Sequence, residues 1–123
     1  MPNKRCLIVD DSEVVRRVIK HMLGAMGVEA SEAVNGLDAL DRCSKSMPDA
    51  ILLDWMMPVQ SGFECLQSLR RLAGSEAAAV IYCTTENDPA EFARALAAGA
   101  SDVLVKPYNR EMLRQKLESL GVL

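Results

Sequence analysis

Two apolar segments of the chain run directly into acidic residues. Residues 6–9 precede Asp10 and Asp11, and residues 51–53 precede Asp54. If both segments are neighbouring parallel strands, these carboxylates meet at one edge of the sheet. Carboxylates about 4 Å apart repel each other by roughly 4 kcal/mol per pair at a protein-like effective dielectric constant, so the cluster must hold protons or recruit a cation. A set of oxygen ligands with room for water suits Mg²⁺.

Two later apolar segments end at residues with different chemistry. Residues 80–83 stop at Thr84, and residues 103–105 stop at Lys106. If these segments are also parallel strands, a hydroxyl and an ammonium share the edge with the acids. An ionised carboxylate beside a cation site and a lysine is suited to accept a phosphoryl group, because positive charge stabilises the phosphoryl oxygens during transfer.

The elements that would position these residues alternate along the chain. Short β-like segments are followed by longer helical patterns, and no repeat or low-complexity tract interrupts them. Five strand-helix units of this kind predict an α/β fold, with a doubly wound, five-stranded parallel sheet and five helices on its two faces. At 123 residues the chain is predicted to be a single domain, residues 1–123, with no attached output domain.

The first predicted helix follows Asp11 and shows a 3.6-residue apolar period. The positions of its apolar stripe are expected to be buried: Val14, Val15, Val18, Ile19, Met22 and Leu23. The basic residues of this helix, Arg16 among them, lie mostly outside the stripe. Ser12 is the predicted N-cap, and Gly24 or Gly27 is the predicted end of the helix.

The fourth predicted helix follows the strand that ends at Thr84. Asp88 and Pro89 are typical of a helix start, with proline at the first helical position. The helix is rich in alanine, and Phe92 and Leu96 are its large apolar anchors. We therefore expect it to be lightly held, as a switching surface must be.

Composition narrows the classes of partner and the cellular compartment. With 17 acidic and 14 basic residues the net charge is −3, which gives no general attraction to nucleic acid or to anionic membranes. The four cysteines show no C-x-x-C spacing and fall mostly in apolar segments, so they are predicted to be small buried hydrophobes without disulfides or zinc. The N-terminal apolar segment is too short for a signal peptide or a membrane span, and we expect a cytoplasmic protein.

Over its whole length the chain resembles the receiver domain of two-component response regulators, and within that family the single-domain CheY-like type. The resemblance rests on the Asp-Asp pair after the first strand, on D-W-M-M-P-V-Q-S-G from Asp54, on Thr84, and on G-A-S-D-V-L-V-K-P ending at Pro107. It implies a flavodoxin-like sheet with strand order 2-1-3-4-5. It also implies a monomer that takes part in phosphorelay signalling, with chemotaxis control and shuttling between histidine-containing proteins both open.

The same resemblance assigns roles to the residues of the acidic cluster. Asp54 would be the phosphoacceptor. Asp11, Asp54 and the backbone carbonyl of Met56 would bind Mg²⁺ directly, and Asp10 would act through water. The protein would be no enzyme apart from magnesium-dependent self-phosphorylation and self-dephosphorylation.

The resemblance also implies what surrounds the acceptor. Lys106 would pair with Asp54 before the reaction and with the phosphoryl oxygens afterwards, while the hydroxyl of Thr84 would move in to the phosphoryl group. Lys106-Pro107 is a candidate cis peptide bond. The phosphoryl donor would be a histidine kinase or a histidine-phosphotransfer protein, and the downstream target would bind the fourth helix, fifth strand and fifth helix.

Two departures from the chemotaxis pattern matter, at Val103 and at Met56. The position three residues before the lysine usually holds an aromatic side chain that swings with the threonine, and here it is Val103. Met56 and Glu86 flank the path of attacking water, so the resemblance does not predict how long the phosphoryl group would persist on this chain.

Two other classes of protein compete with the receiver interpretation. A small phosphatase of the haloacid dehalogenase type also places a nucleophilic aspartate after a strand, but it needs a second aspartate two residues later, where this chain has Met56. A pseudo-receiver that binds partners without phosphorylation is expected to lack part of the residue set. Phosphoryl uptake from a small donor separates both from a receiver.

Overall fold

A parallel sheet lies between layers of helices in a computed structural model that describes residues 3–58 and 60–123. The sheet has five strands in the order β2-β1-β3-β4-β5, and all neighbouring strands run parallel. The strands are β1 (Arg5–Val9), β2 (Glu29–Ala33), β3 (Ala50–Asp54), β4 (Ala79–Thr84) and β5 (Asp102–Val105). The helices are α1 (Glu13–Ala25), α2 (Gly36–Lys45), α3 (Gly62–Arg70), α4 (Pro89–Ala97) and α5 (Arg110–Ser119), with a 3₁₀ turn η1 (Ser75–Ala77) before β4. The predicted fold class and strand order are confirmed.

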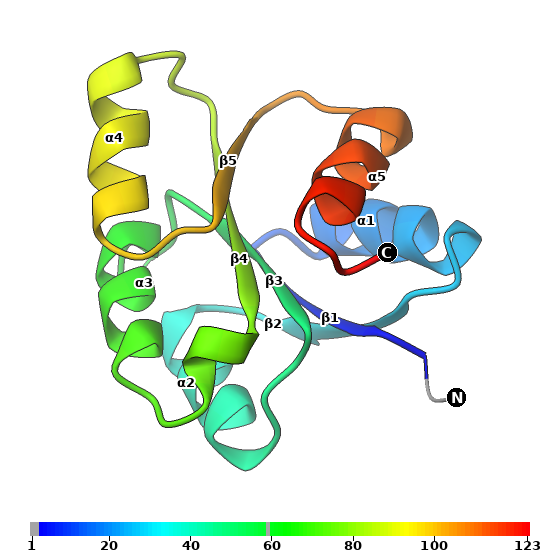
Figure 1. Ribbon diagram of the computed structural model, residues 1–123, viewed down its shortest axis with the longest axis horizontal. Helices are drawn as coiled ribbons and strands as arrows, with labels where there is room; N and C mark the ends of the chain where they lie inside the picture. The colour runs from blue at the N-terminus through cyan, green and yellow to red at the C-terminus, as the bar shows by residue number, and fades with distance from the viewer. Residues whose placement is uncertain (1–2, 59) are drawn as a thin grey trace.

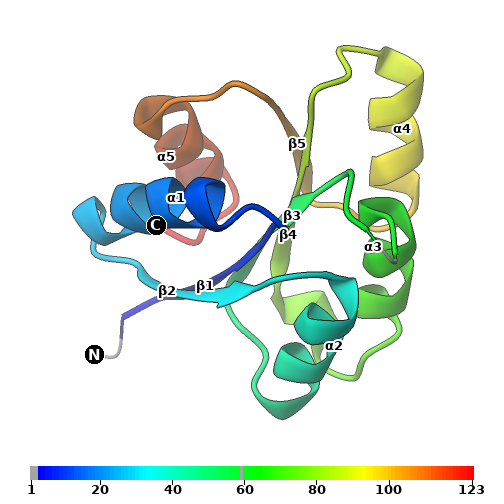
Figure 2. The same cartoon turned by 180° about the vertical axis from the view of Figure 1, so that it is seen from behind.

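Helices cover both faces of the sheet (Figure 1). Helices α1 and α5 lie on one face, and α2, α3 and α4 lie on the other, as the reverse view also shows (Figure 2). Strand side chains alternate between the two resulting cores, so Leu53 and Tyr82 pack on the α2–α4 side while Leu52 and Ile81 pack on the α1/α5 side. Every residue of the central strand β3 is buried. Full burial of one such aliphatic side chain contributes about 1.5–3 kcal/mol to folding.

Polar side chains cap all of the α-helices at the edge where the strands end. In each case the side-chain oxygen accepts a hydrogen bond from a backbone N–H of the first turn, and the caps are Ser12, Asn35, Ser61, Asp88 and Asn109. A cap of this kind contributes about 1 kcal/mol. The predicted caps at Ser12 and Asp88 are confirmed, and the caps fix the direction of the loops at this edge.

The predicted apolar stripe of α1 is only partly buried. Ile19 and Leu23 are buried, but Val14 is 69% exposed and Val18 is 50% exposed, contrary to the prediction. The stripe is wider than the narrow seam that the helix presents to the sheet, so its outer positions face solvent. Arg16, assigned to the polar side, is buried because its guanidinium finds hydrogen-bond acceptors within the protein. The helix ends at Ala25, shortly before one of the predicted stops.

Helix α4 is held differently from the prediction. Leu96 is 48% exposed and anchors little, whereas the small side chain of Ala95 is fully buried and Phe92 packs at the edge of the core. Ala95 is the only residue of α4 that is buried in the described chain. Few groups therefore hold this helix on the sheet.

Three further sequence-based expectations concern local features. The four cysteines are free and buried, as predicted. The Lys106-Pro107 peptide bond is cis, as the resemblance implied. In the described part of the chain, no helix has the length and apolar character needed to cross a bilayer.

Candidate phosphoacceptor site

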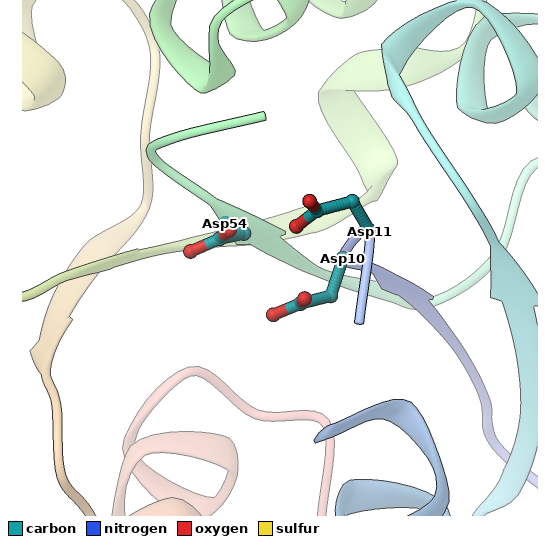
Figure 3. Close-up of side chains that lie close together, drawn as sticks. All are labelled: Asp10, Asp11 and Asp54. Carbon is teal, nitrogen blue, oxygen red and sulfur yellow. The ribbon is translucent and has the colours of Figure 1, made fainter. Parts of the chain in front are cut away.

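The acidic residues meet because β1 and β3 are adjacent and in register. Val9 pairs with Leu53, so Asp10, Asp11 and Asp54 follow at the same edge of the sheet. One carboxylate oxygen from each lies within 4.8 Å of the others (Figure 3). Asp10 and Asp54 are buried, and Asp11 is exposed. Three hard oxygen donors with one side open to water fit a Mg²⁺ site, which takes carboxylates together with water.

Lys106 reaches the acids from the end of β5, across the intervening strand β4. Its Nζ lies 2.7 Å from Oδ1 of Asp54 and 3.4 Å from Oδ2 of Asp10. Its backbone N–H donates a 2.8 Å hydrogen bond to the carbonyl of Thr84, which fixes the start of the lysine side chain. The structure therefore brings the predicted lysine into direct contact with the predicted acceptor.

Burial and neighbouring charges shift the pKa values of Asp54 and Lys106. Burial raises the pKa of Asp54, and Asp10 and Asp11 raise it further, although the Lys106 ammonium opposes this shift. Burial alone would lower the pKa of Lys106, but the adjacent Asp54 and Asp10 carboxylates raise it above its ordinary value. The Lys106 ammonium contacts only two of the three carboxylates, and a bound divalent cation would relieve the remaining repulsion.

Asp10 is held in place by contacts that the sequence did not predict. Its Oδ1 accepts a 2.9 Å hydrogen bond from the backbone N–H of Ser12, and its carbonyl accepts a 2.7 Å hydrogen bond from Nη1 of Arg16. Arg16 is held in turn by Glu32 on β2, at 3.0 Å. Arg16 therefore ties α1 to the backbone of the acidic cluster. The position of Arg16 beside the apolar stripe did not predict this role, because the long arginine side chain can place its guanidinium either in solvent or inside the protein.

Thr84 ends β4 on the face that α4 covers, and its side chain is fully buried. Its Oγ1 accepts a 3.0 Å hydrogen bond from the backbone N–H of Glu86. The hydroxyl is therefore engaged with the loop that leads into α4. It accepts this bond through an oxygen lone pair, so its own O–H is a separate donor.

Gly62 fixes the backbone of Asp54. A Cβ at this position would collide with the carbonyl oxygen of Asp54 and would lie 2.7 Å from Cα of Trp55. Its N–H donates to the Trp55 carbonyl at 3.0 Å, and the Trp55 N–H donates to Cys83 at 2.9 Å. The start of α3 thus packs directly on the end of β3. The sequence did not predict this contact, because close approach of two backbone segments leaves no local pattern.

Met56 lies on the loop between β3 and α3, and its side chain is 63% exposed. This exposed thioether occupies the place where the phosphatase alternative requires a second carboxylate. The position therefore offers no side-chain acid or base for that reaction.

Comparison with known proteins identifies the family. The model of the response regulator receiver domain matches residues 6–118. A chemotaxis protein CheY homolog from Campylobacter jejuni is 36% identical over 118 residues, which are 94% of this chain and 91% of that protein. The structure of chemotaxis protein CheY4 from Vibrio cholerae matches with a TM-score of 0.91 and 34% identity, over 99% of this chain and 100% of that one.

A third match bears on the metal. The receiver domain of the sensor histidine kinase PA1611 from Pseudomonas aeruginosa, with a magnesium ion coordinated in its active site cleft, matches with a TM-score of 0.87 and 27% identity, over 96% of this chain and 97% of that one. The chain belongs to the response regulator receiver domain family, and its role is phosphorelay signalling.

Proposed function

We propose that Asp54 is the phosphoacceptor. The single observation that carries this proposal is the 2.7 Å contact between Lys106 and Asp54 inside the acidic cluster. An oxygen of Asp54 attacks the phosphorus of a phosphohistidine as the P–N bond to the donor breaks. The ammonium then follows the charge from the carboxylate to the phosphoryl oxygens.

We infer that Asp11, Asp54 and the backbone carbonyl of Met56 bind Mg²⁺, with Asp10 acting through water. The oxygen-only donor set, and the raised pKa of Asp54 beside the other acids, support this assignment. When bound, the ion supplies positive charge to the transferring phosphoryl oxygens. The hydroxyl of Thr84 donates a hydrogen bond to the transferred group.

The acceptor is tested by intact-mass measurement after incubation with acetyl phosphate, with Mg²⁺ or with EDTA. The wild-type protein is expected to gain one phosphoryl group only with Mg²⁺, and Asp54→Asn is expected to gain none. Asp41→Asn, an exposed aspartate on α2, is the matched control and should label as the wild type does. Full labelling of Asp54→Asn contradicts the assignment.

We infer that the phosphoryl donor, a histidine kinase or a histidine-phosphotransfer protein, docks beside α1. The exposed side chains of Val14 and Val18 border an apolar groove of about 430 Å³ that continues to Lys106, Pro107 and Tyr108. A helix that carries phosphohistidine can lie in this groove within reach of the acceptor. Val18→Glu is expected to slow transfer from a protein donor but not from acetyl phosphate, because only the former needs the groove. Leu37→Glu, on exposed α2, is the control.

We infer that the downstream target binds the surface formed by α4, β5 and α5. Its exposed apolar side chains include Leu96 and Met112, beside a groove of about 380 Å³ that reaches Val103 and Lys116. This surface lies next to both Thr84 and Lys106, so a movement of either residue on phosphorylation would alter it directly. Beryllofluoride, which mimics an acyl phosphate, should alter amide exchange in α4 and β5. Changes confined to α1 and α2 would contradict this.

We place the protein in the cytoplasm as a monomer that binds neither nucleic acid nor membrane and has no catalytic turnover beyond its own phosphorylation and dephosphorylation. The four free cysteines suit a reducing compartment, and the net charge of −3 disfavours polyanions. Sedimentation velocity with and without beryllofluoride tests the oligomeric state.

A further inference from the structure

Arg16 of α1 is the only arginine or lysine that is buried among the described residues, at 9% exposure. Its Nη1 donates a 2.7 Å hydrogen bond to the backbone carbonyl of Asp10, and its Nε donates a 3.0 Å hydrogen bond to Oε1 of Glu32 on β2. Burial of a cation costs free energy unless the cation is paired and hydrogen-bonded, and this guanidinium has both a carboxylate and a carbonyl as partners. Arg16 is therefore fixed between β2 and the loop that carries two of the clustered acids.

The carbonyl that Arg16 holds belongs to the peptide bond between Asp10 and Asp11. Because a peptide unit is planar and rigid, the direction of this carbonyl sets how the chain leaves Asp10 and enters Asp11. The two side chains extend from this unit toward the side of the site where Asp54 lies (Figure 3). Asp10 has a further restraint, since its Oδ1 accepts a 2.9 Å hydrogen bond from the Ser12 N–H. Asp11 is exposed, so the direction of its carboxylate depends on the backbone before it.

Glu32 orients the Arg16 guanidinium from the neighbouring strand. Glu32 pairs with Ile8 of β1 in the parallel register, so its position is set by the sheet. Its side chain is 33% exposed, and its Oε2 lies 3.7 Å from Nζ of the more exposed Lys20. The bond from Nε to Glu32 leaves Nη1 of the same rigid fork directed at the Asp10 carbonyl. Glu32 and Arg16 therefore connect the sheet to the peptide between the two acids.

We propose that Arg16 is a positioning residue for Mg²⁺ binding, which fixes the peptide that carries the Asp10 and Asp11 carboxylates. The proposal rests on the role that the proposed function gives these carboxylates toward Mg²⁺. Arg16 itself offers no ligand to a cation, because a guanidinium has donors and no acceptor. Its role is to keep the oxygen ligands of the loop in place, as hydrogen bonds behind metal ligands commonly do.

The charge of Arg16 and its positioning role act in opposite directions on the affinity for Mg²⁺. A guanidinium bonded to the backbone of the cluster repels a divalent cation, so loss of its charge alone would tighten Mg²⁺ binding. Loss of the hydrogen bond to Asp10 instead leaves the peptide free to turn, and Mg²⁺ binding weakens because it must restore the orientation. We expect the second effect to prevail, because loss of hydrogen bonds behind metal ligands typically weakens binding by about 10- to 100-fold. The sign of the change therefore decides between the two.

Calorimetric titration with MgCl₂ and urea unfolding in EDTA test the proposal on four single variants. Arg16→Met removes every donor, Arg16→Lys keeps the charge and one donor group, and Glu32→Gln weakens the contact that orients Arg16. Arg17→Met is the matched control, because Arg17 lies on the same helix with 76% of its side chain exposed and pairs with Glu13 one turn away. The half-saturating Mg²⁺ concentration for labelling by acetyl phosphate is a second readout.

Arg16→Met is expected to raise the dissociation constant for Mg²⁺ about tenfold, with Arg16→Lys and Glu32→Gln between it and the wild type. The half-saturating Mg²⁺ concentration for labelling should rise by the same factor, while the extent of labelling at saturating Mg²⁺ stays that of the wild type, because Asp54 is unchanged. The double variant Arg16→Met with Glu32→Gln should bind Mg²⁺ as Arg16→Met does, because both substitutions act through one guanidinium. Arg17→Met should bind Mg²⁺ as the wild type does.

A purely structural role would lower the urea midpoint of Arg16→Met in EDTA and leave its dissociation constant for Mg²⁺ unchanged. That result, or tighter Mg²⁺ binding by Arg16→Met, would overturn the proposal. If Arg16→Met does not fold, Arg16→Lys and Glu32→Gln decide, and wild-type dissociation constants in both would overturn it. Absence of Mg²⁺ binding by the wild-type protein would instead contradict the metal site of the proposed function, so the two failures are distinguishable.

Discussion

Asp11→Asn is expected to stabilise the protein without Mg²⁺. Each pair of carboxylates in the cluster has oxygens within 4.8 Å. At that separation the repulsion is about 3.5 kcal/mol for an effective dielectric constant of 20 and about 1 kcal/mol for that of water. Asp11 is exposed, so the lower figure applies to each pair. Asparagine removes this repulsion from both Asp10 and Asp54, and the free energy of unfolding should rise by about 2 kcal/mol.

Magnesium should reverse the order of stability. A ligand that binds only the folded state stabilises it by about 2.7 kcal/mol at a concentration 100 times its dissociation constant. If Asp11 is a Mg²⁺ ligand as proposed, the wild-type protein gains this increment, whereas Asp11→Asn lacks a charged ligand and gains much less. The variant should therefore be the more stable protein in EDTA and the less stable one at saturating Mg²⁺.

Urea unfolding followed by far-UV circular dichroism, in EDTA and in Mg²⁺, measures both effects. Glu118→Gln is the control, because it changes net charge equally at an exposed site on α5. It should show a small effect that is the same in both buffers. An Asp11→Asn protein that is less stable in EDTA, or that gains as much from Mg²⁺ as the wild type, would show that Asp11 is structural and no ligand.

Three other perturbations test the geometry of the site. Gly62→Ala should destabilise the protein and weaken Mg²⁺ binding, because the added Cβ meets the backbone of Asp54. Gly24→Ala, which has open space around it inside α1, should instead stabilise the protein by about 0.5–1 kcal/mol. Calorimetric melting compares the two variants, and equal melting temperatures would refute the argument. The pKa of Asp54 is raised above its ordinary value of 3.8, so the folded state binds the proton of this carboxyl more tightly than the unfolded state does. The free energy of unfolding in EDTA should therefore fall as the pH rises from 3.8 through the raised pKa of Asp54. Asp54→Asn should lack this part of the pH dependence, and an unchanged profile would contradict it. Trp55 emission should change on adding Mg²⁺ and again on adding beryllofluoride, and no response at proven saturation would mean that the indole does not sense the site.

The sequence predicted the edge of the sheet well because that part of the fold depends on short-range patterns. The apolar segment before Asp54 is buried on both faces, so it could only be an interior strand of a parallel sheet. The caps at Ser12 and Asp88 follow from local hydrogen bonding within one turn. Once the family resemblance supplies the strand order, the meeting of Asp10, Asp11 and Asp54 follows from register alone.

The features that were not predicted from the sequence depend on contacts between side chains that are distant along the chain. The period of α1 gives the direction of Val18 but not how far the sheet extends beneath it, and so its exposure was missed. The burial of Arg16 depends on Glu32 and on a carbonyl of the β1–α1 loop, which no local pattern encodes. In the same way Tyr82 is an ordinary strand residue until β5 places a small Val103 beside it.

The charge at the site explains why a response should spread toward α4 and not α1. Under the proposed assignment, phosphorylation would replace one negative charge on Asp54 with about two on the phosphoryl group. Lys106 is already engaged by Asp54 and Asp10, so the added charge must draw in a donor that is now bound elsewhere. Asp10 is fixed on the α1 side by buried Arg16, whereas the Thr84 hydroxyl is held by a single loop N–H. The Thr84 contact should therefore change first, and its loop leads into α4, the described α-helix with the fewest buried residues.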